Sequence, residues 1–312
     1  MQLTVDLEIS HTFAHQKNLE KLVGKADVSL KPIPLEALLS QYFSLQLAPD
    51  YPLAAVAASA DGINVAEGYW MRADPVHLVL QRDSFSLGEP VPLIVSGQDT
   101  HQMIATLNAH FAQDGMSFFA GKSGAWYMQW PETPDIRTNL PSSVIGKDIH
   151  SFMPKGAYAG KWLSHLNEIQ MLLFEHPVNL AREASGLGVV NSIWISGGGS
   201  LPAQPEASRQ VLLTGDTPLY RGLAKWAGLH YQMLGNVEAL LAMPEQDVRL
   251  YLQADSGLET WLDGFYQALK ARKIKQLTFN IGFYDRCLVA TLQPWDLYRF
   301  WQNNKSLENL LA

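Results

Sequence analysis

The spacing of apolar residues changes between helical and extended periods along the chain. In residues 161–175, Trp162, Leu166 and Ile169 recur at the three- and four-residue spacing of an amphipathic helix. Similar spacing predicts helices over residues 35–45 and 100–112, and a strand–helix–strand unit includes a helix over residues 258–271. Asp216 or Thr217, followed by Pro218, supplies the start of a further helix that runs to about Gly228. Short apolar runs predict strands over residues 3–9, 76–80, 116–119, 125–130, 189–195, 211–214, 248–254, 276–282 and 287–292. Strands that alternate with helices in the second half indicate an α/β fold.

The region from residue 76 to about 150 has a different organisation. Its sequence predicts a strand, a helix and a β-hairpin whose turn contains Gly121 and Gly124, followed by a proline-rich tail. We therefore expect a small α+β domain over residues 76–155. This domain would be inserted into an α/β core made of residues 1–75 and 156–312.

A run of three glycines follows the strand predicted over residues 189–195. We expect this strand to be parallel and buried on both faces, and to open into a glycine loop over residues 196–200. Such a loop either brings backbone N–H groups close to an anionic ligand or makes a plain turn. Residue 202 is proline where a dinucleotide-binding fingerprint needs glycine, so the run is not that fingerprint.

Charge and length exclude several kinds of partner. The 312 residues include 23 Lys and Arg against 30 Asp and Glu, a net charge of −7, which argues against nucleic acid and anionic lipid as partners. The longest uncharged apolar run, residues 53–60, is far shorter than the roughly 20 residues of a membrane helix. A single cysteine, Cys287, excludes internal disulfides. We expect a cytoplasmic protein with no membrane partner.

Candidate metal and nucleophile motifs are sparse. His11 and His15 have the spacing of two ligands on one helical face, but the glutamate of the zinc-protease motif is missing between them. The sequence contains no nucleophile elbow of the serine hydrolases.

Two polar clusters are left as candidate sites. One is Arg72, Asp74 and His77, and the other lies on or beyond the helix of residues 161–175 and includes Glu168, Gln170, His176, Asn179 and Arg182. An arginine can pair with a carboxylate or phosphate through two hydrogen bonds. The alternative is that these side chains cap the helix and connect it to the next loop.

Several of these residues also carry a resemblance to a known family. The sequence His176-Pro177-Val178-Asn179, with Arg182 and residues 190–202, resembles a segment of the archaeal-type, cofactor-independent phosphoglycerate mutases. Residues 219–228 are similar to a helix of that family, and residues 144–154 to the segment that leaves its inserted domain. Residues 70–78 and 166–179 resemble bacterial proteins described as phosphoglycerate mutase-like or as regulator of pathogenicity factors E-type.

The resemblance implies an α/β sandwich of the alkaline phosphatase superfamily with a smaller inserted domain. The mutases use two divalent metals, an Asp-Gly pair after the first strand, a Ser or Thr nucleophile, and Asp and His ligands near the C-terminus. Here Asp6 has no following glycine, and residues 46–52, where the nucleophile loop belongs, contain no Ser or Thr. The last histidine is His230, and the C-terminal ligand motifs lack theirs. A two-metal phosphoryl transfer needs such ligands, so we expect neither mutase nor phosphatase activity by the family mechanism.

These observations favour a catalytically degenerate phosphoglycerate mutase-like protein that binds or regulates and needs no cofactor or metal. Its partner would be a small anionic ligand or another protein. The alternatives are an active mutase or phosphoesterase with a metal site rebuilt from Asp6, His11 and His15, and a purely structural or interaction protein. For the first interpretation we expect no catalytic residue, and a ligand site made of Arg72, Asp74, His77, Glu168, Gln170, His176, Asn179, Arg182, Asn191, Gly197, Gly198 and Gly199.

Overall fold

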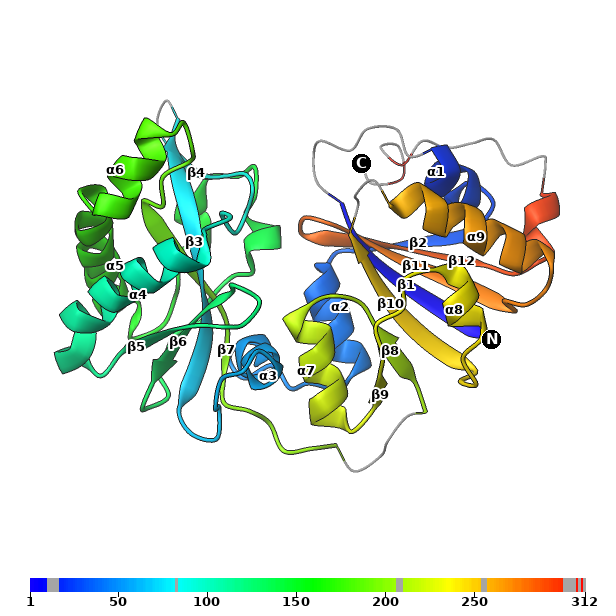
Figure 1. Ribbon diagram of the computed structural model, residues 1–312, viewed down its shortest axis with the longest axis horizontal. Helices are drawn as coiled ribbons and strands as arrows, with labels where there is room; N and C mark the ends of the chain where they lie inside the picture. The colour runs from blue at the N-terminus through cyan, green and yellow to red at the C-terminus, as the bar shows by residue number, and fades with distance from the viewer. Residues whose placement is uncertain are drawn as a thin grey trace. The chain divides into compact units, whose positions relative to one another are not determined.

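The chain folds into two compact units in the computed structural model, and each is described by itself (Figure 1). Unit 1 contains Met1–Leu39 and Gln204–Ala312, and unit 2 contains Ser40–Ala203. The structure describes residues 1–9, 17–81, 84–205, 210–253, 257–299, 307 and 310. No helix in these ranges is both long enough and apolar enough to cross a membrane.

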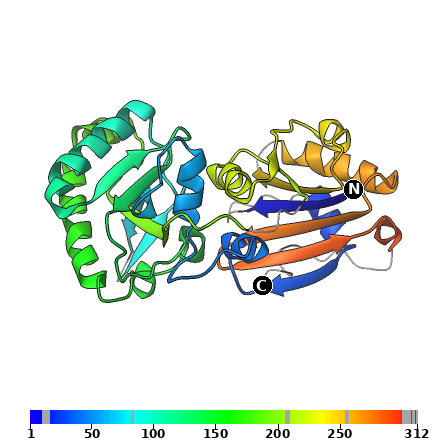
Figure 2. The same ribbon diagram turned by 90° about the horizontal axis from the view of Figure 1, so that it is seen from below.

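Unit 1 is built on a seven-stranded sheet whose central strands run parallel (Figure 2). The first strand lies in the middle and pairs in parallel with a neighbour on each side. The order across the sheet is β2 (Asp27–Lys31), β12 (Arg286–Leu292), β11 (Gln276–Phe283), β1 (Gln2–Glu8), β10 (Asp247–Gln253), β8 (Leu212–Thr214) and β9 (His230–Tyr231). At one edge the pairing is antiparallel, between β11 and β12 and between β12 and β2.

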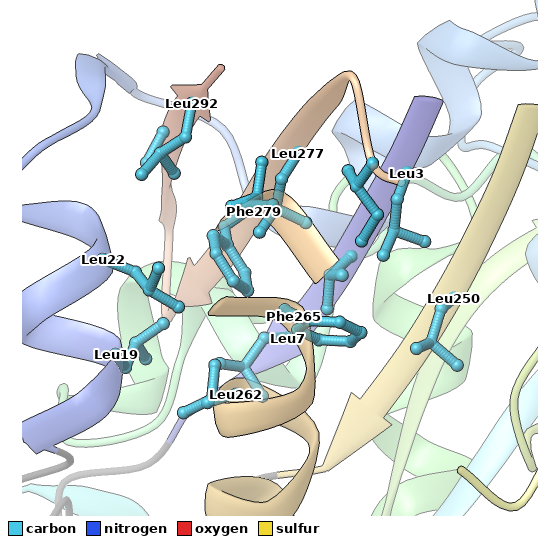
Figure 3. Packing of buried hydrophobic residues seen from close by; sticks show 14 of the residues in the cluster. Leu3, Leu7, Leu19, Leu22, Leu250, Leu262, Phe265, Leu277, Phe279 and Leu292 are labelled. Atoms are coloured by element: carbon cyan, nitrogen blue, oxygen red, sulfur yellow. The ribbon is translucent and has the colours of Figure 1, made fainter. Parts of the chain in front are cut away.

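The two faces of this sheet are different. Leu3, Val5 and Leu7 of β1 lie in an apolar core with side chains of α1 (Lys17–Val23), α8 (Val237–Leu241) and α9 (Leu258–Lys270). Figure 3 shows Leu262 and Phe265 of α9 packed toward the strands in this core. The other face carries polar residues, and α2 (Leu35–Tyr42) and α7 (Pro218–Ala227) lie on that side (Figure 1).

Local sequence signals fix the ends of α7, which later contributes to the site. The side chain of Thr217 caps the helix by accepting a hydrogen bond from the N–H of Tyr220 at 3.1 Å, and Pro218 follows at the first helical position. Gly228 ends the helix in the left-handed region at φ 64°.

Unit 2 contains a five-stranded sheet around one long strand. Its main path is β4 (Phe85–Gly88), β3 (Tyr69–Leu80), β6 (Trp126–Trp130) and β5 (Ser117–Ala120), and β7 (Ser192–Gly199) pairs with β3. The pairing of β3 with β7 is antiparallel. An apolar core joins β3, β5, β6 and β7 to α4 (Gly97–Phe111) and α5 (Ala159–Phe174). The remaining helices of unit 2 are α3 (Leu53–Ala60) and α6 (Pro177–Ala184), with 3-10 turns at Ala112–Asp114, Pro141–Ser143 and Ile149–Phe152. Unit 1 has a 3-10 turn at Asp296–Tyr298.

The α/β class and most predicted elements are confirmed, but the region around β7 differs from expectation. The strand is antiparallel, because its partner is β3 of the same unit rather than a strand of the parallel sheet. Pro177 follows the helix predicted over residues 161–175 and is the first residue of the next helix, α6.

The division of the chain also differs from the expected boundaries. Unit 2 contains residues 76–155 together with the flanking residues 40–75 and 156–203, which sequence analysis placed in the core. The pairing of β3 with β7 explains this division, since it joins both flanks in one sheet.

Candidate functional site

A buried carboxylate lies at the centre of the unit 1 sheet. Asp6 has no solvent exposure, and its carboxylate accepts hydrogen bonds from Arg249 Nε at 2.5 Å and Arg249 Nη2 at 2.8 Å. Asn280 Nδ2 donates to it at 2.7 Å, and the Tyr220 hydroxyl also donates to it. The four residues come from β1, β10, β11 and α7. The Asp6 cluster, as we call these four residues, therefore joins three strands to one helix.

Strand register explains why these side chains meet. Asp6 lies opposite Asn280 of β11 in the strand register. Arg249 of β10 lies opposite Thr4, which is two residues before Asp6 on β1. Because side chains alternate between the faces of a strand, residues 4 and 6 point to the same face, away from the apolar core. Tyr220 reaches this face from α7, where it is buried.

The charges in the Asp6 cluster stabilise each other. Burial alone lowers the pKa of Arg249, but the nearby Asp6 carboxylate raises it, so that the net shift is upward and the guanidinium stays charged. Burial raises the pKa of the Tyr220 hydroxyl well above its ordinary value, and the Asp6 charge adds to this effect. The tyrosine therefore remains a hydrogen-bond donor to the carboxylate.

A divalent metal does not fit at Asp6. A carboxylate offers about four lone-pair positions, and the Asp6 carboxylate receives two hydrogen bonds from Arg249, one from Asn280 and one from Tyr220. A dication there would also lie beside a buried guanidinium of the same sign. Within the described ranges, no group of three or more His, Cys, Asp and Glu side chains could hold a metal ion. His11 and His15 lie outside the described residues.

The first predicted polar cluster lies on β3 of unit 2. Arg72 forms an ion pair with Asp74, and its guanidinium carbon lies 5.3 Å from the centroid of the Tyr127 ring. Burial lowers the pKa of Arg72, but the charge of Asp74, the hydrogen bond to it and the nearby Tyr127 and Asp61 together outweigh burial, so the net shift is upward. His77 is separate from this pair, because its Nδ1 lies 2.9 Å from the carbonyl of Val189.

The second predicted cluster connects α6 to the segment before β7. Asn179 donates to the carbonyls of Leu173 at 2.7 Å and Val190 at 2.8 Å, and accepts from the N–H of Val190 at 2.9 Å. Arg182 is buried and donates to the carbonyls of Gly188 at 2.8 Å and Ile94 at 3.2 Å. Both side chains thus satisfy backbone groups of the protein.

His176 and Asn191 have similar roles. Nδ1 of His176 accepts from the N–H of Val178 at 3.2 Å and so caps α6, while its Nε2 lies 3.0 Å from the Thr106 hydroxyl. Burial lowers the pKa of His176, which favours this neutral form. The Asn191 side chain accepts a hydrogen bond from the N–H of Leu78 at 2.7 Å and donates one to the carbonyl of Leu78 at 2.9 Å.

The helix α5 contributes the last two predicted polar residues. Glu168 is half-exposed and pairs with His110 at 2.7 Å. Gln170 Nε2 donates to the hydroxyl of Ser192 at 3.3 Å. The structure therefore brings His77, Gln170, Asn179, Arg182 and Asn191 together around residues 188–192, whereas Arg72, Asp74 and Glu168 have partners elsewhere in unit 2.

The prediction of a glycine loop over residues 196–200 is wrong. Gly197, Gly198 and Gly199 are the last three residues of the strand, and all three are buried. A Cβ on Gly199 would lie 2.5 Å from Pro52 Cβ, and a Cβ on Gly198 would lie 2.5 Å from the Tyr69 hydroxyl. The glycines therefore allow the start of α3 and a tyrosine to approach β7 closely.

Sequence analysis missed three residues of the Asp6 cluster: Arg249, Asn280 and Tyr220. A signal was present for two of them, because Arg249 and Asn280 are polar residues with apolar neighbours on both sides in their strands. Buried polar residues in such positions need partners. Their partner, Asp6, is more than 240 residues away in the sequence, so only the strand register identifies it.

Comparisons with known proteins support the resemblance seen in the motifs. The chain is 30% identical over 142 residues to the 2,3-bisphosphoglycerate-independent phosphoglycerate mutase of Methanosarcina barkeri, covering 43% of this chain and 35% of that protein. It is 34% identical over 92 residues to the enzyme of the same name from Methanothrix thermoacetophila, covering 28% and 24%. The chain thus matches only about a quarter to a third of the length of these relatives.

A solved structure was also found. The cofactor-independent phosphoglycerate mutase of Thermoplasma acidophilum aligns with 94% of this chain and 90% of its own, at 14% identity and a TM-score of 0.41. No protein-family model matches the chain. The sequence relatives confirm that the chain is phosphoglycerate mutase-like.

Proposed function

We propose that the chain is a phosphoglycerate mutase-like protein with a binding or regulatory role and without two-metal phosphoryl transfer. In this proposal its fold derives from the alkaline phosphatase superfamily, and its partner is a small anionic ligand or another protein. The sequence relatives support the mutase-like part of the proposal. The bonding of Asp6 is the observation that carries the rest.

Two-metal phosphoryl transfer needs carboxylates whose lone pairs point to metal ions, and the ions neutralise charge on the attacking and leaving oxygens. Asp6 is the first-strand aspartate that the resemblance offers as such a ligand. Its carboxylate instead receives hydrogen bonds from Arg249, Asn280 and Tyr220 inside the protein. Arg249 supplies the compensating positive charge, so the carboxylate serves the fold instead of a metal.

The matched motif in unit 2 supports the same proposal. Asn179 and Arg182 bond backbone groups next to β7, and His176 caps α6. These contacts explain a sequence similarity to the mutases without a shared reaction, since they stabilise one local arrangement of helix and strand. The ligand site predicted from these residues therefore stays a prediction that needs a binding measurement.

The test combines metal analysis with turnover. Protein purified without chelator is analysed by elemental mass spectrometry, and phosphoester turnover is measured with added Mn²⁺ or Zn²⁺ on 3-phosphoglycerate and p-nitrophenyl phosphate. An active mutase of the M. barkeri type serves as the positive control. We expect less than stoichiometric metal and no turnover. Stoichiometric metal with turnover that is lost in His11→Ala or His15→Ala would overturn the proposal and favour a rebuilt metal site.

A positive test of the binding role uses the same protein. Small anions, beginning with inorganic phosphate and 3-phosphoglycerate, are titrated by calorimetry. Binding without turnover is the expected result, and Arg72→Met and Arg182→Met show whether the predicted residues take part. Anion binding that neither variant changes would exclude these two arginines from the site.

A further inference from the structure

A hollow in unit 1 lies where the parallel strands begin, at the opposite end of the strands from Glu8, the last residue of β1. Its volume is about 410 Å³, which is within the range of small-molecule sites. Residues just before β8 and β10 and at the start of β9 line it, and these are Gln210, Val211, Gly228, Leu229, His230, Pro244 and Glu245. The hollow is therefore distinct from the Asp6 cluster and from the carboxyl ends of the strands.

One wall of the hollow carries a paired histidine and glutamate. His230 Nδ1 lies 2.5 Å from Glu245 Oε1. The His230 side chain is 53% exposed, whereas that of Glu245 is 19% exposed. The second oxygen of the carboxylate, Oε2, is covered and has no hydrogen-bond partner among the described residues. The hydrogen bond from His230 lowers the pKa of Glu245, which keeps the carboxyl group ionised near neutral pH.

This pairing fixes the hydrogen-bonding character of both side chains. An ionised carboxylate only accepts hydrogen bonds, so Nδ1 of His230 carries the proton that points to Glu245. In the neutral imidazole, Nε2 then holds a lone pair and is an acceptor. The dyad thus offers Nε2 of the exposed His230 side chain as an acceptor, with the negative charge of Glu245 directly behind it.

The rest of the hollow fits the same kind of ligand. Helix α7 ends at Gly228, and the carbonyl end of a helix carries partial negative charge. Val211, Leu229 and Pro244 supply apolar surface beside these groups. The net charge of −7 adds a general attraction for cations.

We propose that this hollow binds a small organic cation with N–H donors, an ammonium or guanidinium group on a short apolar chain. An N–H group would donate to Nε2 of His230, the Glu245 carboxylate would attract the positive charge, and the chain would lie on the apolar wall. This site goes beyond the proposed function and involves none of the residues that support it.

The test measures binding of agmatine, which carries both groups, by calorimetry at pH 8 on the full chain. Choline is the comparison ligand, since it has the positive charge but no N–H donor. We expect agmatine to bind and choline to bind at least about tenfold more weakly, the ratio that a charged hydrogen bond supplies. Equal affinities, or no agmatine binding at millimolar concentration, would overturn the proposal.

Two variants locate the site and one serves as a matched control. Glu245→Gln and His230→Gln should each weaken agmatine binding at least about tenfold. Asp27→Asn removes an exposed carboxylate at the other side of the unit 1 sheet, where Asp27 of β2 pairs with Arg299 at 2.8 Å, and should leave binding unchanged. Thermal melts check that all three variants fold. Equal weakening by Glu245→Gln and Asp27→Asn would show that agmatine responds to net charge alone, and would refute a site at the hollow.

Discussion

The Asp6 cluster makes a quantitative prediction about stability. In Arg249→Met, the carboxylate of Asp6 remains fully buried but loses its counter-charge and two hydrogen bonds, at 2.5 and 2.8 Å. Asp6→Asn creates the reverse defect, a buried guanidinium without its partner charge. Removal of one member of a buried ion pair typically destabilises a protein by about 3–5 kcal/mol.

The double variant distinguishes the energy of the ion pair itself from the cost of changing the two side chains. With Asp6→Asn and Arg249→Met combined, neither charge is left uncompensated, so the loss should be smaller than the sum of the two single losses. We expect a coupling energy of at least about 1 kcal/mol between the two sites. Arg221→Met provides a matched control, because Arg221 pairs at 2.8 Å with Asp216, whose side chain is 78% exposed. An exposed pair contributes only about 0–1 kcal/mol.

The assay is urea unfolding followed by circular dichroism and tryptophan fluorescence, with thermal melts in parallel. A loss of 3–5 kcal/mol corresponds to a fall in Tm of roughly 10 °C for a unit of this size. If Arg249→Met is no less stable than Arg221→Met, the pair does not stabilise the sheet. If the single losses add up to that of the double variant, the two residues do not act as one cluster.

Three further predictions concern unit 2. A Cβ on Gly199 would lie 2.5 Å from Pro52 Cβ, so Gly199→Ala should destabilise by about 1–3 kcal/mol in urea unfolding. Gly160→Ala, in α5 with nothing within 4 Å, should instead stabilise by up to about 1 kcal/mol. Asn179→Ala leaves backbone groups unpaired and should lower the unfolding free energy by about 1–3 kcal/mol. Burial lowers the pKa of His165, so the native state binds fewer protons than the unfolded chain, and Tm should fall as pH drops below about 6.5.

Each of these predictions has a result that would contradict it. Equal effects of Gly199→Ala and Gly160→Ala would show that close packing against α3 is unimportant. A neutral Asn179→Ala would mean that the backbone groups next to β7 find other partners. For His165, the decisive comparison is the His165→Phe variant, in which the loss of stability between pH 7.5 and 5 should become smaller. An unchanged loss would assign the pH dependence to other groups.

Elements that are specified by residues close together in the sequence were predicted well. The amphipathic spacing of residues 161–175 identified α5, and Thr217, Pro218 and Gly228 marked both ends of α7. The hairpin with Gly121 and Gly124 also forms as expected. In these cases the signal and the structure depend on residues a few positions apart, and so the sequence is sufficient.

Elements whose character depends on distant partners were missed or misread. The apolar run 53–60 forms helix α3, whose near-continuous apolar sequence gives no helical period because most of its residues are buried. Strand β7 looked like a parallel strand with a glycine loop, since burial on both faces produces the same apolar sequence in either direction. The three glycines fit neighbours from α3 and β3 that no local pattern reveals.

The sequence by itself determined the α/β class, most of the strands and helices, the acidic charge and the similarity to phosphoglycerate mutases. The tertiary structure alone decided what the polar residues do. Asp6 meets Arg249 because β1 and β10 are neighbours in register, across 243 residues of chain. Hydrogen bonds and ion pairs depend on distances of about 3 Å, and only the folded chain brings atoms so far apart in sequence to such distances.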